Sequence, residues 1–320
     1  MDFSNNVDAI WNAFCDELPL DLQPHARALA VGMVLAPLPE IPWSMVFKNE
    51  VTLAAPALFA TAMPQATRQM TMTATTAHML AVIVAFATDR MLDGQAEGSP
   101  QVLRLLEHMR VERDRAICEL TGSEVSPYQD AEYSALCAIN TERILLHHGI
   151  ALSFSDYSKL SLAKQAVAFP ASLALARAAG GDGRHKRAIE SVLRGIVLGL
   201  QFHDDVVDWE DDWNKGGAWA VSLGRGLAIR ESASGSGMPN VESVRRLVHR
   251  SGVLATMMTM ARWRYRMAAR LAAMLGADRL SGWAREQELT AAELAEREGN
   301  SAGYVVRAHQ LSSWATEVIE

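Results

Sequence analysis

The amino-acid sequence predicts an all-α protein, and three observations carry that prediction. Apolar residues recur at the three- and four-residue spacing of a helix face along most of the 320 residues. Sustained alternation of apolar and polar residues, and β-branched runs bounded by turn residues, are hard to find. Clusters of glycine and proline divide the chain into segments of helical length.

The predicted helices end at clusters that contain glycine or proline: LAPLPEIPW at 35–43, GQAEGSP at 94–100, TGSEVSP at 121–127 and AGGDGR at 179–184. The most linker-like segment is SASGSGMPN at 232–240, which we expect to form a mobile surface loop or lid. In chain order, helices are expected near residues 5–17, 24–36, 68–93, 99–121, 128–149, 157–179, 184–213, 240–276, 278–298 and 301–318.

The composition is that of a globular protein, because 49% of the residues are hydrophobic and can bury a large core. We expect a single all-α domain over residues 1–320, with two closely fused halves as the alternative. The net charge is −7 and the basic residues are scattered, which argues against a nucleic-acid partner. A small-molecule enzyme is therefore the starting hypothesis.

The cysteines and the N-terminus indicate a location. Cys15, Cys118 and Cys137 lack metal-like spacing and are odd in number, which favours a reducing compartment such as the cytoplasm. The N-terminus, MDFSNNVDAI, has neither the basic start nor the apolar stretch of a signal peptide. The longest apolar runs, near MLAVIVAFAT, are shorter than the roughly 20 residues of a membrane span. We therefore expect a soluble, cytoplasmic protein without a transmembrane segment.

An acidic cluster lies in LGLQFHDDVVDWEDDW, residues 198–213. In a helix, Asp204, Asp208 and Asp212 form a row on one face because they are four residues apart, and Asp205 flanks them. Such a row is locally unfavourable, since like charges repel and acids near a helix C-terminus meet the unfavourable end of its dipole. Mg²⁺, which prefers oxygen ligands, would turn the repulsion into coordination. The alternative is a solvated acidic face, which the preceding apolar segment disfavours.

A second acidic pair, Asp89 and Asp93, ends the apolar run at 79–88. Gly94 directly after it indicates that the helix stops there. The same four-residue spacing thus occurs at the ends of two apolar helices. We expect the two acidic faces to meet across a cavity.

The segments LQFHDDVVD and TDRMLD resemble the two aspartate-rich motifs of the class I isoprenoid synthase superfamily, which includes trans-prenyltransferases and class I terpene synthases. In TDRMLD, Arg90 stands where a second aspartate is usual, so this motif is a degraded form. The resemblance implies a helical bundle around a central apolar cavity. It also implies Mg²⁺, three ions in this superfamily, as the cofactor. The metal ligands that it implies are Asp89, Asp93, Asp204, Asp208 and Asp212, with Asp205 as a rival for one of these places.

The resemblance also assigns residues to a prenyl diphosphate substrate. Lys164, which begins KQAVAFPASLALARAAGG, and Lys215 resemble two lysines that contact the diphosphate, and Arg90 is a further candidate. Phe86 and Phe202 lie near the motifs and could stabilise a carbocation with their ring faces.

The leading interpretation of the reaction is that of a terpene synthase, which ionises a linear allylic prenyl diphosphate to give a cyclised or rearranged product. Chain-elongating prenyltransferases hold isopentenyl diphosphate with paired arginines after the first motif and with an N-terminal Gly-Lys-Arg segment. Here GQAEGSP follows Asp93, and the N-terminal third has no such segment. A prenyltransferase that condenses a prenyl diphosphate with an acceptor is the alternative within the superfamily.

Two other interpretations stay open. A noncatalytic subunit with this fold is one, because Arg90 would displace a carboxylate from the metal site. An HD-type metal phosphohydrolase is the other, because His203 precedes Asp204, although no further histidines follow the pattern that such a site needs. Homodimers are frequent in the superfamily, so a homodimer is a further expectation.

Two further segments carry clustered charges, and only the first, at 262–266, is a candidate for the diphosphate site. Arg264 and Tyr265, in RWRYR, either contact the diphosphate or belong to a basic helix face, and the second is favoured. The alternating charges of VERDRAICE, residues 111–119, are typical of an exposed, salt-bridged helix.

Overall fold

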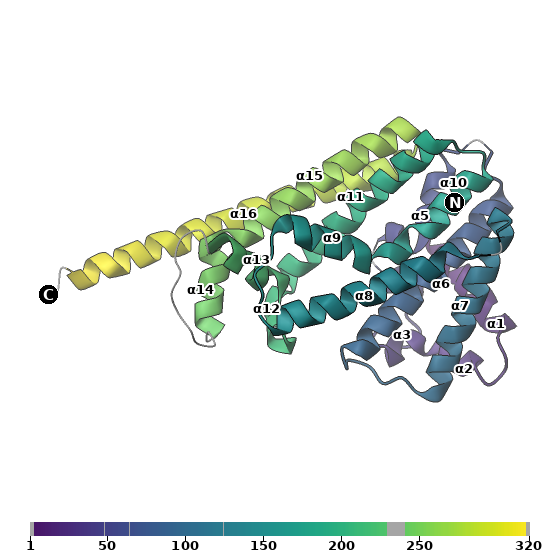
Figure 1. Ribbon diagram of the computed structural model, residues 1–320, viewed down its shortest axis with the longest axis horizontal. Coiled ribbons are helices and arrows are strands. Elements are labelled where there is room, and N and C mark those ends of the chain that lie inside the picture. Colours follow the sequence, from purple (N-terminus) through teal and green to yellow (C-terminus); the bar gives the residue numbers. More distant parts are fainter. Residues whose placement is uncertain (1–2, 48, 64, 124, 229–240, 318–320) are drawn as a thin grey trace. The chain divides into compact units, whose positions relative to one another are not determined.

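The described part of the chain is helical. The computed structural model describes residues 3–47, 49–63, 65–123, 125–228 and 241–317. Every regular element within these ranges is a helix, so the all-α prediction is confirmed (Figure 1). The linker-like segment at 232–240 lies outside the described residues. In chain order the helices are α1 (Phe3–Glu17), α2 (Gln23–Arg27), α3 (Leu29–Gly32), α4 (Trp43–Val46), α5 (Glu50–Ala60), α6 (Arg68–Leu92), α7 (Pro100–Thr121), α8 (Pro127–His147), α9 (Phe154–Lys164), the 3₁₀ turn η1 (Ala166–Ala168), α10 (Pro170–Ala178), α11 (Gly183–Val207), α12 (Trp209–Lys215), α13 (Trp219–Ala228), α14 (Val241–Ser251), α15 (Val253–Leu275) and α16 (Asp278–Glu317).

Several predicted helices had the wrong ends. The helix expected at 157–179 is interrupted by η1, and α10 starts afresh with Pro170 in its first turn, where proline is tolerated. The helix expected at 240–276 is divided by Gly252, whose φ of 65° ends α14. The two helices expected after residue 278 are one helix, α16, and the short helices α4, α5 and α13 were missed.

The chain divides into two compact units, each assembled from separate stretches of sequence. Unit 1 comprises Met1–Leu136, Gln165–Leu193 and Ala272–Leu280. Unit 2 comprises Cys137–Lys164, Arg194–Leu271 and Ser281–Glu320. The single domain expected over the whole chain stays a prediction beside this division.

Helix α6 is the central helix of unit 1 and packs against α5, α7 and α10. Its N-terminus is capped by Thr67, whose hydroxyl accepts a hydrogen bond from the Met70 N–H at 3.2 Å. Among the described helices, α6 is the one whose length and composition would suit a membrane span. Its most apolar stretch is 61% buried within the protein, as in the core helix of a soluble protein.

A kink in α5 is linked to a buried histidine of α6. Pro56 lies inside α5, and the backbone of Ala54 is non-helical, with φ −130° and ψ 22°. Because proline has no N–H, the Thr52 carbonyl lacks the donor that residue 56 would supply in a regular helix. The Nε2 atom of His78 lies 3.0 Å from that carbonyl oxygen and satisfies it.

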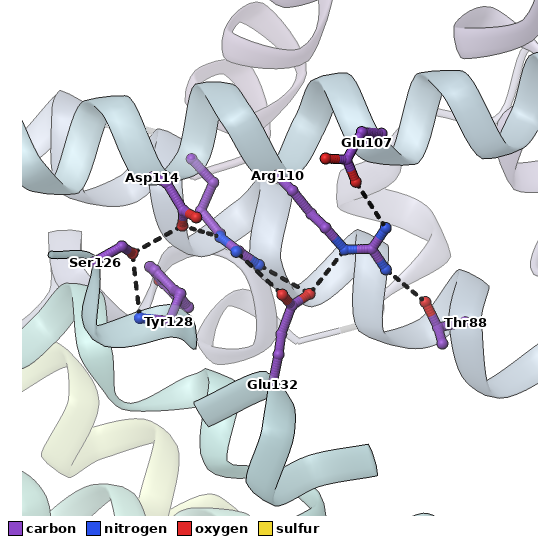
Figure 2. Close-up of polar contacts among 8 residues, drawn as sticks. Thr88, Glu107, Arg110, Asp114, Ser126, Tyr128 and Glu132 are labelled. Carbon is purple, nitrogen blue, oxygen red and sulfur yellow. Dashed lines mark hydrogen bonds and ion pairs between the residues drawn. The ribbon is translucent and has the colours of Figure 1, made fainter. Parts of the chain in front are cut away.

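Helices α7 and α8 are joined in unit 1 by a buried ion-pair network (Figure 2). The Arg113 side chain is 1% exposed and pairs with Asp114 at 2.8 Å and Glu132 at 3.0 Å. Its guanidinium also lies 4.6 Å from the centre of the Tyr128 ring. Figure 2 shows Glu132 reaching Arg110 as well, at 3.1 Å. The expectation that 111–119 is a simply exposed, salt-bridged segment was therefore wrong at Arg113.

In unit 2, α11 approaches α15 closely because two glycines face it. A Cβ atom on Gly199 would lie 2.6 Å from the Tyr265 ring, and one on Gly195 would lie 3.0 Å from the Arg264 carbonyl oxygen. Tyr265 is fully buried and packs edge-on against Trp283, with ring centres 5.9 Å apart. Close helix packing therefore holds the half of α11 that leads to the acidic cluster.

Candidate metal and diphosphate site

The acidic row continues through a break in its helix. Helix α11 ends at Val207, Asp208 has non-helical torsion angles of φ −105° and ψ 9°, and α12 begins at Trp209. The helix predicted over 184–213 is therefore two helices. Across the break, the Asp208 N–H still donates to the Asp204 carbonyl at 3.0 Å, and the Asp212 N–H donates to the Asp208 carbonyl at 3.0 Å. Because this four-residue hydrogen bonding continues, the three carboxylates stay in register along one side of the backbone.

The break also changes the electrostatics of the cluster. Glu210, Asp211 and Asp212 occupy the first turn of α12, where the positive end of the helix dipole favours negative charge. The sequence had placed them at an unfavourable C-terminus instead. Asp204 and Asp205 remain near the C-terminus of α11, so the local conflict is reduced rather than removed.

The pKa of Asp212 is shifted by burial and by other charged residues of unit 2. Burial raises the pKa of this carboxyl to about 6, and the negative charges of Asp204 and Asp208 add to the effect. Lys215 and Lys164 oppose it with their positive charges. The charges of two other predicted metal ligands and of both predicted diphosphate lysines therefore act on Asp212.

Asp205 has different surroundings from its neighbour Asp204. Asp204 is exposed, whereas Asp205 is 5% exposed and accepts hydrogen bonds from the Tyr157 hydroxyl and, at 2.9 Å, from Gln201 Nε2. Burial raises the pKa of Asp205 well above its usual range, and the hydrogen bond from Tyr157 opposes this shift. Asp205 thus belongs to a buried polar network, which makes Asp204, Asp208 and Asp212 the better metal-binding candidates.

Lys164 is the last residue of α9, and its ammonium is held by a residue that the sequence reasoning missed. The Lys164 Nζ atom lies 3.1 Å from Oε2 of Glu142, and the other carboxylate oxygen, Oε1, accepts a hydrogen bond from Trp219 Nε1–H at 3.0 Å. Glu142 is on α8, where it lies in line with the apolar residues Ala138 and Leu146. In the sequence, Glu142 could have been recognised as an acidic residue within an apolar stripe of its helix.

A tight turn places Lys215 and Trp219 on either side of two glycines. Gly216 and Gly217 have φ values of 140° and 149°, which favour glycine. A Cβ atom on Gly217 would lie 2.8 Å from the Leu146 side chain, so this position also lacks space for one. Lys215 is exposed at the end of α12, whereas Trp219 is 5% exposed.

The first aspartate pair lies in unit 1, at the end of α6. Asp93 is the C-cap of this helix, and the Asp93 N–H donates to the Asp89 carbonyl at 2.9 Å. Gly94 follows with φ 67°, so the predicted helix end is confirmed. The Arg90 guanidinium donates a hydrogen bond to Gln95 in the loop that follows.

The described aromatic side chains divide into packed and partly open groups. Phe86 is half-buried and lies 4.8 Å from Phe47, measured between ring centres. Phe202 is fully buried in the core of unit 2, 5.0 Å from the Tyr157 ring. The complete burial of Tyr265 argues against a role in binding the diphosphate.

The predicted site residues therefore fall into two groups. Unit 2 gathers the acidic row with Lys164 and Lys215, while Asp89, Asp93, Arg90 and Phe86 belong to unit 1. The meeting of the two acidic faces across a cavity stays a prediction.

Solved structures with the same architecture are synthases of prenyl chains. A geranylgeranyl pyrophosphate synthase from Lactobacillus brevis superposes with a TM-score of 0.69 at 15% identity, covering 88% of this chain and 95% of its own. A polyprenyl synthetase from Streptomyces coelicolor superposes with a TM-score of 0.64 at 15% identity, covering 92% of this chain and 97% of its own. The chain has the isoprenoid synthase fold. A polyprenyl synthase from Roseobacter denitrificans also matches, with a TM-score of 0.54 at 15% identity over 89% of this chain and 99% of its own.

The similarity is one of fold, because no known family matches the sequence and no curated protein is similar to it in sequence. The resemblance drawn from the two aspartate-rich motifs is confirmed at this level.

The carboxylates of this isoprenoid synthase fold suit Mg²⁺. Within the described residues, no three histidine, cysteine or acidic side chains converge into a ready-made metal site. Mg²⁺ does not need such a cage, because it keeps several waters and usually binds one or two carboxylates together with substrate phosphates. Asp204 and Asp208 are exposed and Asp212 is partly buried, so the donor set of the row fits an ion that keeps several waters. His203 is half-buried beside them, and the HD-type interpretation gains no support from the described histidines.

Proposed function

We propose that this chain is an enzyme that binds a linear allylic prenyl diphosphate. With Mg²⁺, it breaks the carbon–oxygen bond between the prenyl chain and the diphosphate. The observation that carries the proposal is the register of Asp204, Asp208 and Asp212 along one side of the backbone, in the same compact unit as Lys164 and Lys215. A set of carboxylates with two lysines suits a magnesium diphosphate, because the acids hold the metal and the ammonium groups hold phosphate oxygens. The isoprenoid synthase fold and the printed names of its neighbours support the same class of substrate.

In the proposed mechanism, Lys164 and Lys215 bind the diphosphate, and Asp204, Asp208 and Asp212 would hold the Mg²⁺. When bound, Mg²⁺ would neutralise the charge that develops on the leaving diphosphate. The two ammonium groups would contribute to the same stabilisation through their positive charges. The hydrocarbon chain would lie against apolar and aromatic side chains, which exclude water from the carbocation.

The finer proposal is a one-substrate reaction of the terpene synthase kind. It is supported by the loop after Asp93, whose residues up to Pro100 include no arginine. Condensation with a second substrate is the other candidate, and the names of the structural neighbours favour it, since polyprenyl and geranylgeranyl diphosphate synthases extend prenyl chains.

One assay separates these candidates. Purified protein is incubated with geranyl, farnesyl or geranylgeranyl diphosphate and Mg²⁺, with and without isopentenyl diphosphate, and released diphosphate and products are measured. Cyclised or rearranged products without the second substrate would support the one-substrate reaction, and longer prenyl diphosphates formed only with it would support condensation.

Two variants link the activity to the site. Asp208→Asn should lower diphosphate release about 100-fold, because a lost ligand weakens stabilisation of the leaving group by a few kcal/mol. Asp156→Asn is the control, since Asp156 is an exposed acid on α9 that pairs with Lys159 at 3.2 Å. Equal release by wild type and Asp208→Asn would contradict the proposal.

A noncatalytic subunit would differ in binding as well as in activity. Calorimetry with Mg²⁺ and inorganic diphosphate should show interdependent binding if the site is intact, because each ligand completes the other's coordination. We also propose a cytoplasmic location, which the three free cysteines support.

A further inference from the structure

Glu142 links two parts of unit 2 through its two carboxylate oxygens. Oε2 lies 3.1 Å from the Lys164 ammonium, and Oε1 accepts the Trp219 indole N–H at 3.0 Å. The three residues come from α9, α8 and α13, which are labelled in Figure 1. One carboxylate therefore connects a predicted diphosphate lysine to the packed interior.

The Trp219 side of this linkage is rigid. Trp219 is 5% exposed, and its ring meets that of the fully buried Tyr157 edge-on, with centres 5.3 Å apart. The Glu142 side chain itself is 15% exposed. A carboxylate held from behind by an indole N–H is a fixed negative charge, whereas a lysine side chain is long and flexible. Glu142 therefore limits where the Lys164 ammonium can go.

The acidic row is a second source of negative charge near the same lysine. Lys164 is among the charges that act on Asp212, so its ammonium lies within electrostatic range of the row. If the ammonium settled on that row, it would occupy carboxylate oxygens that the proposed function assigns to Mg²⁺. Glu142, 3.1 Å from the ammonium, supplies a negative charge that competes with the row for it.

We propose that Glu142 is a positioning residue that holds the Lys164 ammonium off the Asp204 to Asp212 row, leaving the row open to Mg²⁺ and the lysine directed at the diphosphate. This inference rests on the proposed function of the row. Glu142 itself contacts neither the metal nor the substrate. Its effect is exerted through Lys164.

The experiment measures binding of Mg²⁺ by calorimetry, alone and with inorganic diphosphate, for wild type and four variants. Glu142→Gln keeps an acceptor for the Trp219 N–H but removes the charge that restrains Lys164. We expect its Mg²⁺ affinity to fall about 10-fold, as for other residues that orient a metal site from behind. Lys164→Met should weaken diphosphate binding without weakening that of Mg²⁺ alone.

The double variant Glu142→Gln/Lys164→Met is decisive. If Glu142 acts by restraining Lys164, removing the lysine should restore the Mg²⁺ affinity that Glu142→Gln loses. A packing defect would persist in the double variant. Asp156→Asn is the matched control, because it also removes an acid from a lysine of α9, at the exposed Asp156–Lys159 pair, and should leave Mg²⁺ binding unchanged. Thermal unfolding checks that each variant is folded.

The outcomes separate this inference from the proposed function. If Glu142→Gln binds Mg²⁺ as tightly as wild type, the role of Glu142 is overturned. The same holds if the loss of Mg²⁺ affinity persists in the double variant. Neither result contradicts the metal site itself. If wild type binds neither Mg²⁺ nor diphosphate, the proposed function and the inference are both overturned.

Discussion

The Nε2 atom of His78 on α6 lies 3.0 Å from the carbonyl oxygen of Thr52, the backbone acceptor that Pro56 leaves unsatisfied in α5. The ring is 1% exposed, so its contact with the carbonyl has no competition from water. Because a backbone carbonyl can only accept, Nε2 carries the proton in this contact. One side chain thereby compensates for a proline inside a neighbouring helix.

Removing this donor should destabilise unit 1. We expect His78→Leu to lower the free energy of unfolding by about 1–3 kcal/mol, since it leaves a buried carbonyl without a partner. In a Pro56→Ala background, the backbone regains an N–H at this position, and the same His78 substitution should cost less. Urea unfolding of the four proteins measures this difference, and equal costs in both backgrounds would contradict the explanation.

The same histidine predicts how stability depends on pH. Burial lowers the pKa of His78 from its usual 6.5 to about 4, while hydrogen bonds to the Thr52 and Val51 backbone oppose the shift. The folded protein therefore keeps the ring neutral between these values, whereas the unfolded chain takes up a proton. The contribution of His78 to the free energy of unfolding is constant above pH 6.5. It falls by about 3 kcal/mol as the pH drops towards 4. His78→Leu should lose that part of the dependence in unfolding curves recorded across this range.

Arg113 predicts a large effect from a single charge. Arg113→Met should destabilise the protein by about 1–3 kcal/mol, because Asp114 and Glu132 lose a buried partner while Glu132 keeps Arg110. Arg113→Met/Glu132→Met should recover part of the loss, since Glu132 no longer lacks this partner. Arg115→Met is the control, because its side chain is 65% exposed, and it should change stability by less than about 0.5 kcal/mol. Thermal or urea unfolding would report all three.

The glycines of α11 predict a packing effect. Gly199→Ala should cost about 1–3 kcal/mol, because the added Cβ would lie 2.6 Å from the ring of the buried Tyr265. Gly282→Ala is the matched control in α16, where nothing lies within 4 Å of the added atom, and it should stabilise the helix by about 0.5–1 kcal/mol. Opposite shifts in the unfolding midpoint are expected, and a shared sign would argue against close packing at Gly199.

Asp205 and Asp208 should respond differently to the same substitution. Since Asp205 is 5% exposed and its carboxyl is held in a buried network by Tyr157 and Gln201, Asp205→Asn keeps the shape of the side chain and should keep diphosphate release within about threefold of wild type. Asp208→Asn, at an exposed carboxylate of the row, should lose about 100-fold. Equal losses would mean that Asp205 also serves the metal.

Local patterns predicted the parts of the site that depend on spacing along the chain. The end of α6 at Asp93 and Gly94 was correct because a left-handed glycine ends a helix whatever surrounds it. The register of Asp204, Asp208 and Asp212 was correct because it depends on four-residue hydrogen bonding, which continues through the break at Asp208.

Contacts between distant residues could not be predicted in this way. Glu142 was missed because its partner Trp219 is 77 positions away in the sequence. Arg113 looked exposed because its charged neighbours on α7 suggested surface pairs, while its partner Glu132 comes from α8. In both cases the missing information was which helix packs against which.

The continuous hydrogen bonding across Asp208 also limits how this region can vary in length. Inserting or deleting one residue between Asp204 and Asp212 would rotate every later side chain by about 100° about the helix axis. The last carboxylate would then point away from the first, although no acidic residue had been lost. The residues between the three aspartates can therefore be substituted more freely than residues can be inserted or deleted there.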